Sequence, residues 1–149
     1  MRDSSRDPVL QSGDVINQPG HPFDGFVVVS VYTRAQAIAD GVLIDATTGD
    51  LAEVSAQHFP GVHVAMTATV GELIRRAVEH PDHGNDWKGV WHDILHMSRF
   101  CPVQAVPGGR LFRVIITGTG RRRLHTLKAI VHPGDKGEPC FTIMLPEED

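Results

Sequence analysis

The stretch that most constrains the fold is residues 31–45, because it carries both a start signal and a stop signal for one short helix. Thr33 and Gln36 have the spacing of a capping box, in which each side chain can bond the free backbone N–H of the other residue. Gly41 lies where a left-handed residue would end that helix. Apolar runs at 26–31 and 42–44 flank it. The stretch therefore predicts a strand–helix–strand unit.

Composition points to an ordinary soluble protein with one domain. The chain has 149 residues, of which 41% are hydrophobic and 21% are charged, and both shares are typical of globular domains. Residues 1–22 are polar and rich in Gly and Pro, so they predict a flexible tail before a single domain at 23–149. The tail has no apolar core of a secretory signal, and no run reaches the roughly 20 apolar residues that span a bilayer. We expect a cytoplasmic protein.

Three further helices follow from the spacing of apolar residues. The first covers 51–58 and ends at Pro60-Gly61. The second is capped by Thr67 or Thr69 and has apolar positions at helical spacing through Val78. The third, 87–100, carries both tryptophans on a broad apolar face and is closed by the proline at 102. Between the first two, residues 62–66 predict a strand or an extended connection.

The last third of the chain changes from helical to strand patterning. Apolar runs at 111–117, 124–131 and 140–145 are separated by glycine-rich turns, which is typical of an antiparallel meander. We interpret the glycine pairs at 118/120 and 134/137 as parts of hairpin turns, and the acidic end as a solvated tail. The expected fold is α+β, with about four short helices packed on a small, mainly antiparallel sheet that ends in a C-terminal three-stranded meander.

A pair of histidines is the most specific hint of metal chemistry. His92 and His96 are four residues apart, so on a helix both face the same way, as the zinc ligands of hydrolase helices do. Asp93 follows the first histidine, but a zinc hydrolase has the longer Glu there as its general base. No third ligand has the required spacing. The interpretation we favour is two partly exposed side chains beside the apolar face, with no metal or other cofactor.

Arginines are concentrated in the predicted meander. Arg121, Arg122 and Arg123 are consecutive in one hairpin, and Arg110, Arg113 and Lys128 are close in sequence. The net charge of −4 argues against binding of nucleic acid or membrane over the whole surface, but a local patch could meet phosphates or an acidic partner. Alternatively, these residues form a solvated edge that resists aggregation.

Several other polar residues lie within structured stretches. Tyr32, Arg34 and the aspartates could line a shared pocket, or they could serve as helix caps and turn formers. Cys101 and Cys140 belong to no Cys-x-x-Cys pair, and we expect two buried free thiols. The tentative binding residues are therefore Tyr32, Arg34, Asp40, Asp45, Asp93, Arg121, Arg122, Arg123 and Asp135.

Three blocks of sequence resemble a family of short bacterial proteins of unknown function. These blocks are Tyr-Thr-Arg-Ala-Gln-Ala-Ile-Ala-Asp-Gly-Val-Leu-Ile-Asp from residue 32, Trp-His-Asp-Ile-Leu-His-Met from residue 91, and the C-terminal stretch from Leu-Lys-Ala at residue 127 to the acidic end. The family is encoded on plasmids, integrative elements and phages. Its pattern has tryptophans at the positions of His92 and His96, whereas Asp93 fits it. The resemblance implies an accessory or anti-defence role and supplies no activity.

Three hypotheses about function follow. The first is a non-enzymatic accessory protein of a mobile genetic element that binds and inhibits a host protein of defence (anti-CRISPR or anti-restriction type) or of replication. The second is a small enzyme or nucleotide-binding domain that uses a polar site around Tyr32, Arg34, Asp45 and Asp93. The third is nucleic-acid binding through the hairpin at 121–123.

Overall fold

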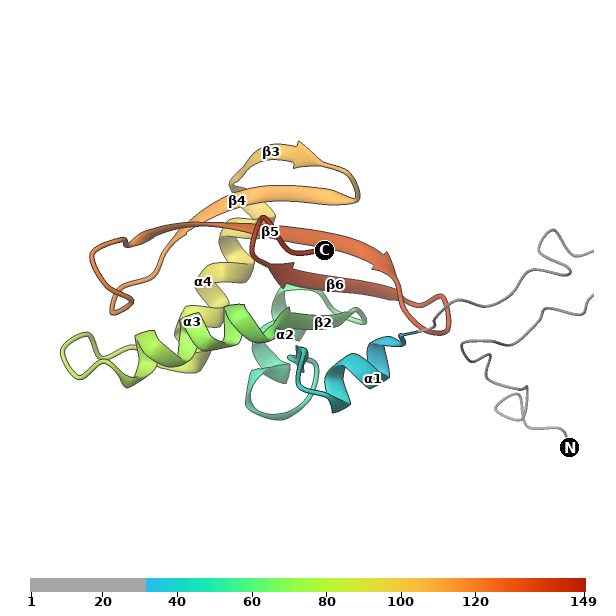
Figure 1. The fold of residues 1–149 in the computed structure, drawn as a ribbon, viewed down its shortest axis with the longest axis horizontal. Coiled ribbons are helices and arrows are strands. Elements are labelled where there is room, and N and C mark those ends of the chain that lie inside the picture. Colours follow the sequence, from blue (N-terminus) through green and yellow to red (C-terminus); the bar gives the residue numbers. More distant parts are fainter. Residues whose placement is uncertain (1–31) are drawn as a thin grey trace, which may run out of the picture. The chain divides into compact units, whose positions relative to one another are not determined.

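The computed structural model describes residues 32–149, and Arg34–Asp149 forms one compact unit (Figure 1). The predicted tail at 1–22, the predicted strand at 26–31 and the predicted domain start at residue 23 lie outside the described residues. The secondary structure elements, in chain order, are α1 (Arg34–Ala39), β1 (Leu43–Asp45), the 3₁₀ turn η2 (Gly49–Leu51), α2 (Ala52–His58), β2 (His63–Thr67), α3 (Ala68–Glu79), α4 (Trp87–Phe100), β3 (Pro102–Val106), β4 (Gly109–Ile115), β5 (Leu124–Pro133) and β6 (Pro139–Met144).

These strands form one six-stranded sheet in the order β1-β2-β6-β5-β4-β3. Only β2 and β6 run parallel, and every other neighbouring pair is antiparallel. The predicted α+β fold is therefore confirmed, with β4, β5 and β6 as the C-terminal meander. The sequence patterns did not predict β3, which begins at the proline that was expected only to close the preceding helix.

One face of the sheet packs against the helices and forms the core. Alternation along β4 and β6 points Phe112, Val114, Phe141 and Ile143 to this face, where all four are buried. The helices contribute apolar side chains at helical spacing, above all Trp91, which is fully buried. Figure 1 shows α4 extending from beside α3 towards β3 and β4. The helix predicted at 87–100 and the capping role of Thr67 at α3 are both confirmed.

The stop signal of α1 works as the sequence predicts. Gly41 has a φ of 78°, which a residue with a side chain rarely adopts. The N–H of Val42 donates to the carbonyl of Ala37 at 2.9 Å, and the N–H of Gly41 donates to Ile38 at 3.1 Å. This pair of bonds is a Schellman motif, which satisfies carbonyls left free at the helix end.

The acidic end is the expected solvated tail at Glu147 and Asp149, which are exposed, but not at Glu148. The carboxylate of Glu148 accepts hydrogen bonds from the hydroxyls of Thr67 (2.8 Å) and Thr69 (2.5 Å) and from the N–H of Leu145 (2.8 Å). It therefore joins the C-terminal segment to the first turn of α3. Burial would raise the pKa of Glu148, but the hydrogen bonds from Thr69, Leu145 and Thr67 and the charge of Lys128 lower it overall.

Candidate binding surface

Arg34 and Asp135 are brought together although 101 residues separate them. The backbone N–H of Arg34 donates to Asp135 Oδ1 at 2.8 Å, and the N–H of Ala35 donates to Oδ2 at 3.0 Å. Asp135 lies in the turn between β5 and β6 and thus caps the N-terminus of α1 from a distant part of the chain. These two N–H groups hold the pKa of Asp135 below its usual value, because they bind the ionised carboxylate.

The side chain of Arg34 also contacts the sheet. Its guanidinium donates to Thr142 Oγ1 at 2.9 Å and lies 3.2 Å from His132 Nε2. His132 Nδ1 lies 3.1 Å from the carbonyl oxygen of Pro133, which requires the proton on Nδ1 and leaves Nε2 as the acceptor. Thr142 is buried on the face opposite the core, since its neighbours Phe141 and Ile143 point into the core. Arg34 and Asp135 thus dock α1 against the outer face of the sheet.

The other tentative polar residues have different neighbours. Asp45 accepts from the N–H of Thr47 at 2.8 Å and from the Thr48 hydroxyl at 3.3 Å, so its carboxylate stabilises the turn after β1. Asp93 lies on the exposed side of α4, Asp40 is exposed just after α1, and Tyr32 is 57% exposed. Arg34 and Asp45 therefore have different hydrogen-bond partners, and Asp93 lies on the exposed side of another helix.

Three histidines meet where α2 packs on α4. His58 Nε2 lies 2.9 Å from His92 Nδ1, and the ring of His96 is 6.3 Å from that of His58 between centroids. Within residues 32–149 no group of three or more His, Cys, Asp or Glu side chains has an arrangement that could hold a metal ion. Spacing on α4 had suggested two of these histidines, whereas the contribution of His58 depends on tertiary packing. Cys101 and Cys140 are free thiols; Cys140 is buried, but Cys101 is exposed, contrary to expectation.

The arginine cluster lies in the loop between β4 and β5. Arg121, Arg122 and Arg123 are all exposed, and no ion pair of the described residues involves their side chains. The loop is bonded to α3, because the Arg76 guanidinium donates to the Thr119 carbonyl at 2.9 Å. Gly118 and Gly120 have φ values of 86° and 110°, in agreement with the predicted turn. The three guanidinium groups thus lie on a fixed basic loop.

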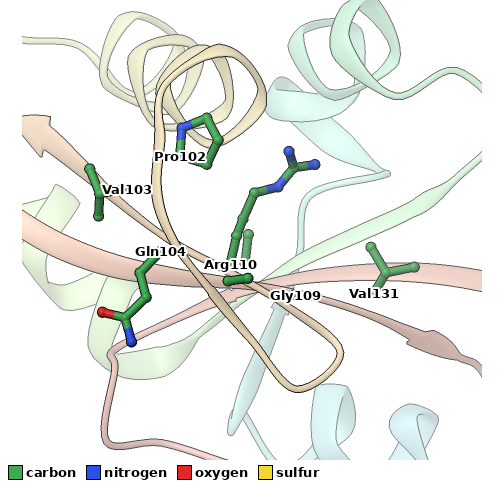
Figure 2. Close-up of a pocket in the computed structure, with 8 residues that line it drawn as sticks. Pro102, Val103, Gln104, Gly109, Arg110 and Val131 are labelled. Carbon is green, nitrogen blue, oxygen red and sulfur yellow. The ribbon is translucent and has the colours of Figure 1, made fainter.

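A groove that the sequence did not predict lies at the other end of β4. It has a volume of about 590 Å³ and is open to solvent (Figure 2). Arg110 is the only charged residue that lines it, and the side chain of Arg110 makes no hydrogen bond or ion pair with another residue of the described part of the chain. The lining residues are Pro102, Val103, Gln104, Ala105, Gly109, Arg110, Ala129 and Val131.

Strand register explains why the groove exists. Arg110 pairs with Ala105 on one side and with Ala129 on the other, so the three side chains form one row across the sheet. This row continues the face that carries Phe112, and no residue of α4 lines the groove. Val103 and Val131 beside it are 52% and 56% exposed. Pro107-Gly108 between two short apolar runs was the sequence signal that could have revealed the β3–β4 hairpin.

Comparisons with known proteins give no relative. No family model matches the chain, no curated protein matches it, and no solved structure is similar. Among the described residues, no helix has the length and apolar character that crossing a membrane requires.

Proposed function

We propose that this protein is a non-enzymatic, cytoplasmic accessory protein of a mobile genetic element that binds and inhibits a host protein of defence or replication. The genetic setting comes from the resemblance of residues 32–149 to the plasmid and phage family. The observation that carries the binding proposal is the groove beside Arg110. It joins exposed aliphatic side chains to one cation that has no hydrogen-bond or ion-pair partner within residues 32–149.

The lining of the groove defines what the partner must present. Arg is enriched at the centres of protein interfaces because its stem packs on apolar groups while its planar head binds carboxylates. Exposed Val103 and Val131 supply the apolar contact beside it. A host protein surface that places a carboxylate between aliphatic or aromatic side chains would therefore be complementary to this groove.

The test compares charge reversal at two arginines of β4, one inside the groove and one outside it. Arg110→Glu reverses the charge in the groove, whereas Arg113→Glu makes the same change on β4 at an exposed position outside the groove. Wild-type protein should capture a stoichiometric partner from host lysate. With the purified partner, Arg110→Glu should weaken binding at least about 30-fold, a loss of about 2 kcal/mol. Arg113→Glu should change it less than about threefold.

An activity measurement must accompany binding. Plating efficiency of a phage on a host with an active defence system should rise when the wild-type protein is expressed, and Arg110→Glu should abolish the rise. Equal loss of binding in both arginine variants, or capture of no stoichiometric protein, would contradict the proposal.

The basic loop supports nucleic-acid binding as a second candidate function. Arg121, Arg122 and Arg123 are exposed, which suits contact with phosphates, and their loop is bonded to α3 through Arg76 and the carbonyl of Thr119. Affinity for a duplex of random sequence should fall with salt, with a log–log slope of about −3 if all three contact phosphates. Replacing the three by Ala should remove this slope, whereas Arg75→Ala on α3 should leave it unchanged. Absence of binding at low salt would rule this function out.

A further inference from the structure

The contact between His58 and His92 is the polar link between the end of α2 and the middle of α4. His58 is 8% exposed and lies against α4 through the 2.9 Å contact with His92 Nδ1. The ring centroids of these two histidines are 4.8 Å apart, and that of His96 is 5.8 Å from His92. His92 and His96 lie on the exposed side of α4, so solvent protons reach the cluster from that side.

Only one proton can lie between the two facing nitrogens. His58 Nδ1 is buried and has no hydrogen-bond partner among the described residues. A proton on that nitrogen would leave a buried N–H without an acceptor, which costs about 1–3 kcal/mol. When both rings are neutral, the proton between them is therefore on His58 Nε2, which donates to the lone pair of His92 Nδ1. In this arrangement His58 Nδ1 is a bare acceptor.

A second proton has no favourable place in this pair. On His92 Nδ1 it would face the N–H of His58, and on His58 Nδ1 it would create a buried cation with an unsatisfied donor. The titratable and charged groups that act on His58 all come from α4: His92, Arg99 and His96. They are all basic, and no carboxylate of residues 32–149 is among them. Burial first, and then these charges, lower the pKa of His58.

We propose that the His58–His92 contact is an acid-sensitive latch, which holds α2 on α4 when both rings are neutral and releases it when the pair takes up a second proton. Histidine is the side chain that changes charge in this pH range, and a released helix is a simple two-state element. The chain carries an internal reporter of that release. Trp91 on α4 is fully buried and donates from Nε1 to the hydroxyl of Ser55 on α2 at 2.9 Å.

The test follows the full chain from about pH 8 to about pH 5. Histidine ring NMR signals give the protonation of each ring, and hydrogen exchange reports α2 and β5 separately. Tryptophan fluorescence reports exposure of Trp91 when it is measured in a Trp87→Phe background, because Trp87 is the second tryptophan of the chain. Below pH 6.5 the emission of Trp91 should shift to the red, and the protection factors of α2 amides should fall at least about tenfold, while β5 amides keep theirs.

Two variants test the assignment. His58→Phe keeps an aromatic ring without a titrating nitrogen, and His92→Gln removes the partner at an exposed position that tolerates change. His58→Phe should abolish the acid response of α2, and His92→Gln should reduce it, because His58 stays buried in that variant. His83→Gln, which changes an exposed histidine in the α3–α4 loop, should leave the response unchanged. The latch is refuted if α2 protection is independent of pH, if β5 opens together with α2, or if the two variants respond as the wild type does.

Discussion

The hydroxyl of Ser55 should make a large contribution to the free energy of unfolding. It accepts from Trp91 Nε1 at 2.9 Å and donates to the carbonyl of Ala46 at 2.7 Å, and all three residues are buried. One oxygen atom thus satisfies a donor on α4 and an acceptor after β1. Ser55→Ala would leave both without this partner. Each unsatisfied buried group costs about 1–3 kcal/mol, so with two such groups the free energy of unfolding should fall by about 2–6 kcal/mol.

Ser98 provides the matched control. It is also a buried serine, but its hydroxyl donates at 2.7 Å to the carbonyl of Leu95 in its own helix. Ser98→Ala removes a hydroxyl of the same size and leaves no buried donor without a partner, so its cost should stay below about 1 kcal/mol. With a slope of about 2 kcal/mol per molar urea, Ser55→Ala should lower the unfolding midpoint by about 1–3 M and Ser98→Ala by less than about 0.5 M.

A double-mutant cycle tests the cause. Trp91→Phe removes the donor, so the cost of Ser55→Ala should be smaller in that background, with a coupling energy of about 1–2 kcal/mol. Equal midpoints for Ser55→Ala and Ser98→Ala, or a coupling energy near zero, would refute the reasoning from unsatisfied buried groups.

Three further predictions concern the remaining structural links. Asp135→Ala should destabilise the protein by about 1 kcal/mol and speed amide exchange at Arg34 and Ala35, with exposed Asp82→Ala as the unaffected control. In the folded protein the pKa values of Asp135 and Glu148 lie below the ordinary 3.8 and 4.5, so the unfolded chain binds protons at a higher pH than the folded one. The urea midpoint should therefore decrease as pH falls below 4.5. The decrease should be smaller in Glu148→Gln. Gly109→Ala should cost more than about 2 kcal/mol in the same assay, since its Cβ would lie 1.8 Å from the Ala129 carbonyl oxygen, whereas Gly84→Ala meets no atom within 4 Å and should show only the smaller cost of its positive φ.

Local patterns were sufficient for most of the elements. Apolar spacing placed the helix at 87–100 with both ends correct, and Gly41 marked the end of α1. The three C-terminal strands were recognisable because their turns are rich in glycine and their alternation is short-range. Only β3 was overlooked, since it is an exposed edge strand whose side chains show no buried face.

Sequence could not pair residues that meet only after folding. It proposed Arg34 and Asp135 as polar positions of interest, but an alternative role as turn former was equally open for Asp135. Their contact across 101 residues depends on the β5–β6 turn being placed beside α1. The same holds for His58, which has no helical spacing to His92 and joins it only because α2 packs on α4.

What the sequence determined by itself is the α+β class, the helices and the meander, because caps, turns and apolar periodicity act over a few residues. What only the tertiary structure decided is where polar and apolar groups are left without partners. The groove around Arg110 arises from strand register, which places Arg110 in one row with Ala105 and Ala129, and this register is not encoded in a local pattern. Binding surfaces of this kind are therefore visible only once the sheet and its helices are in place.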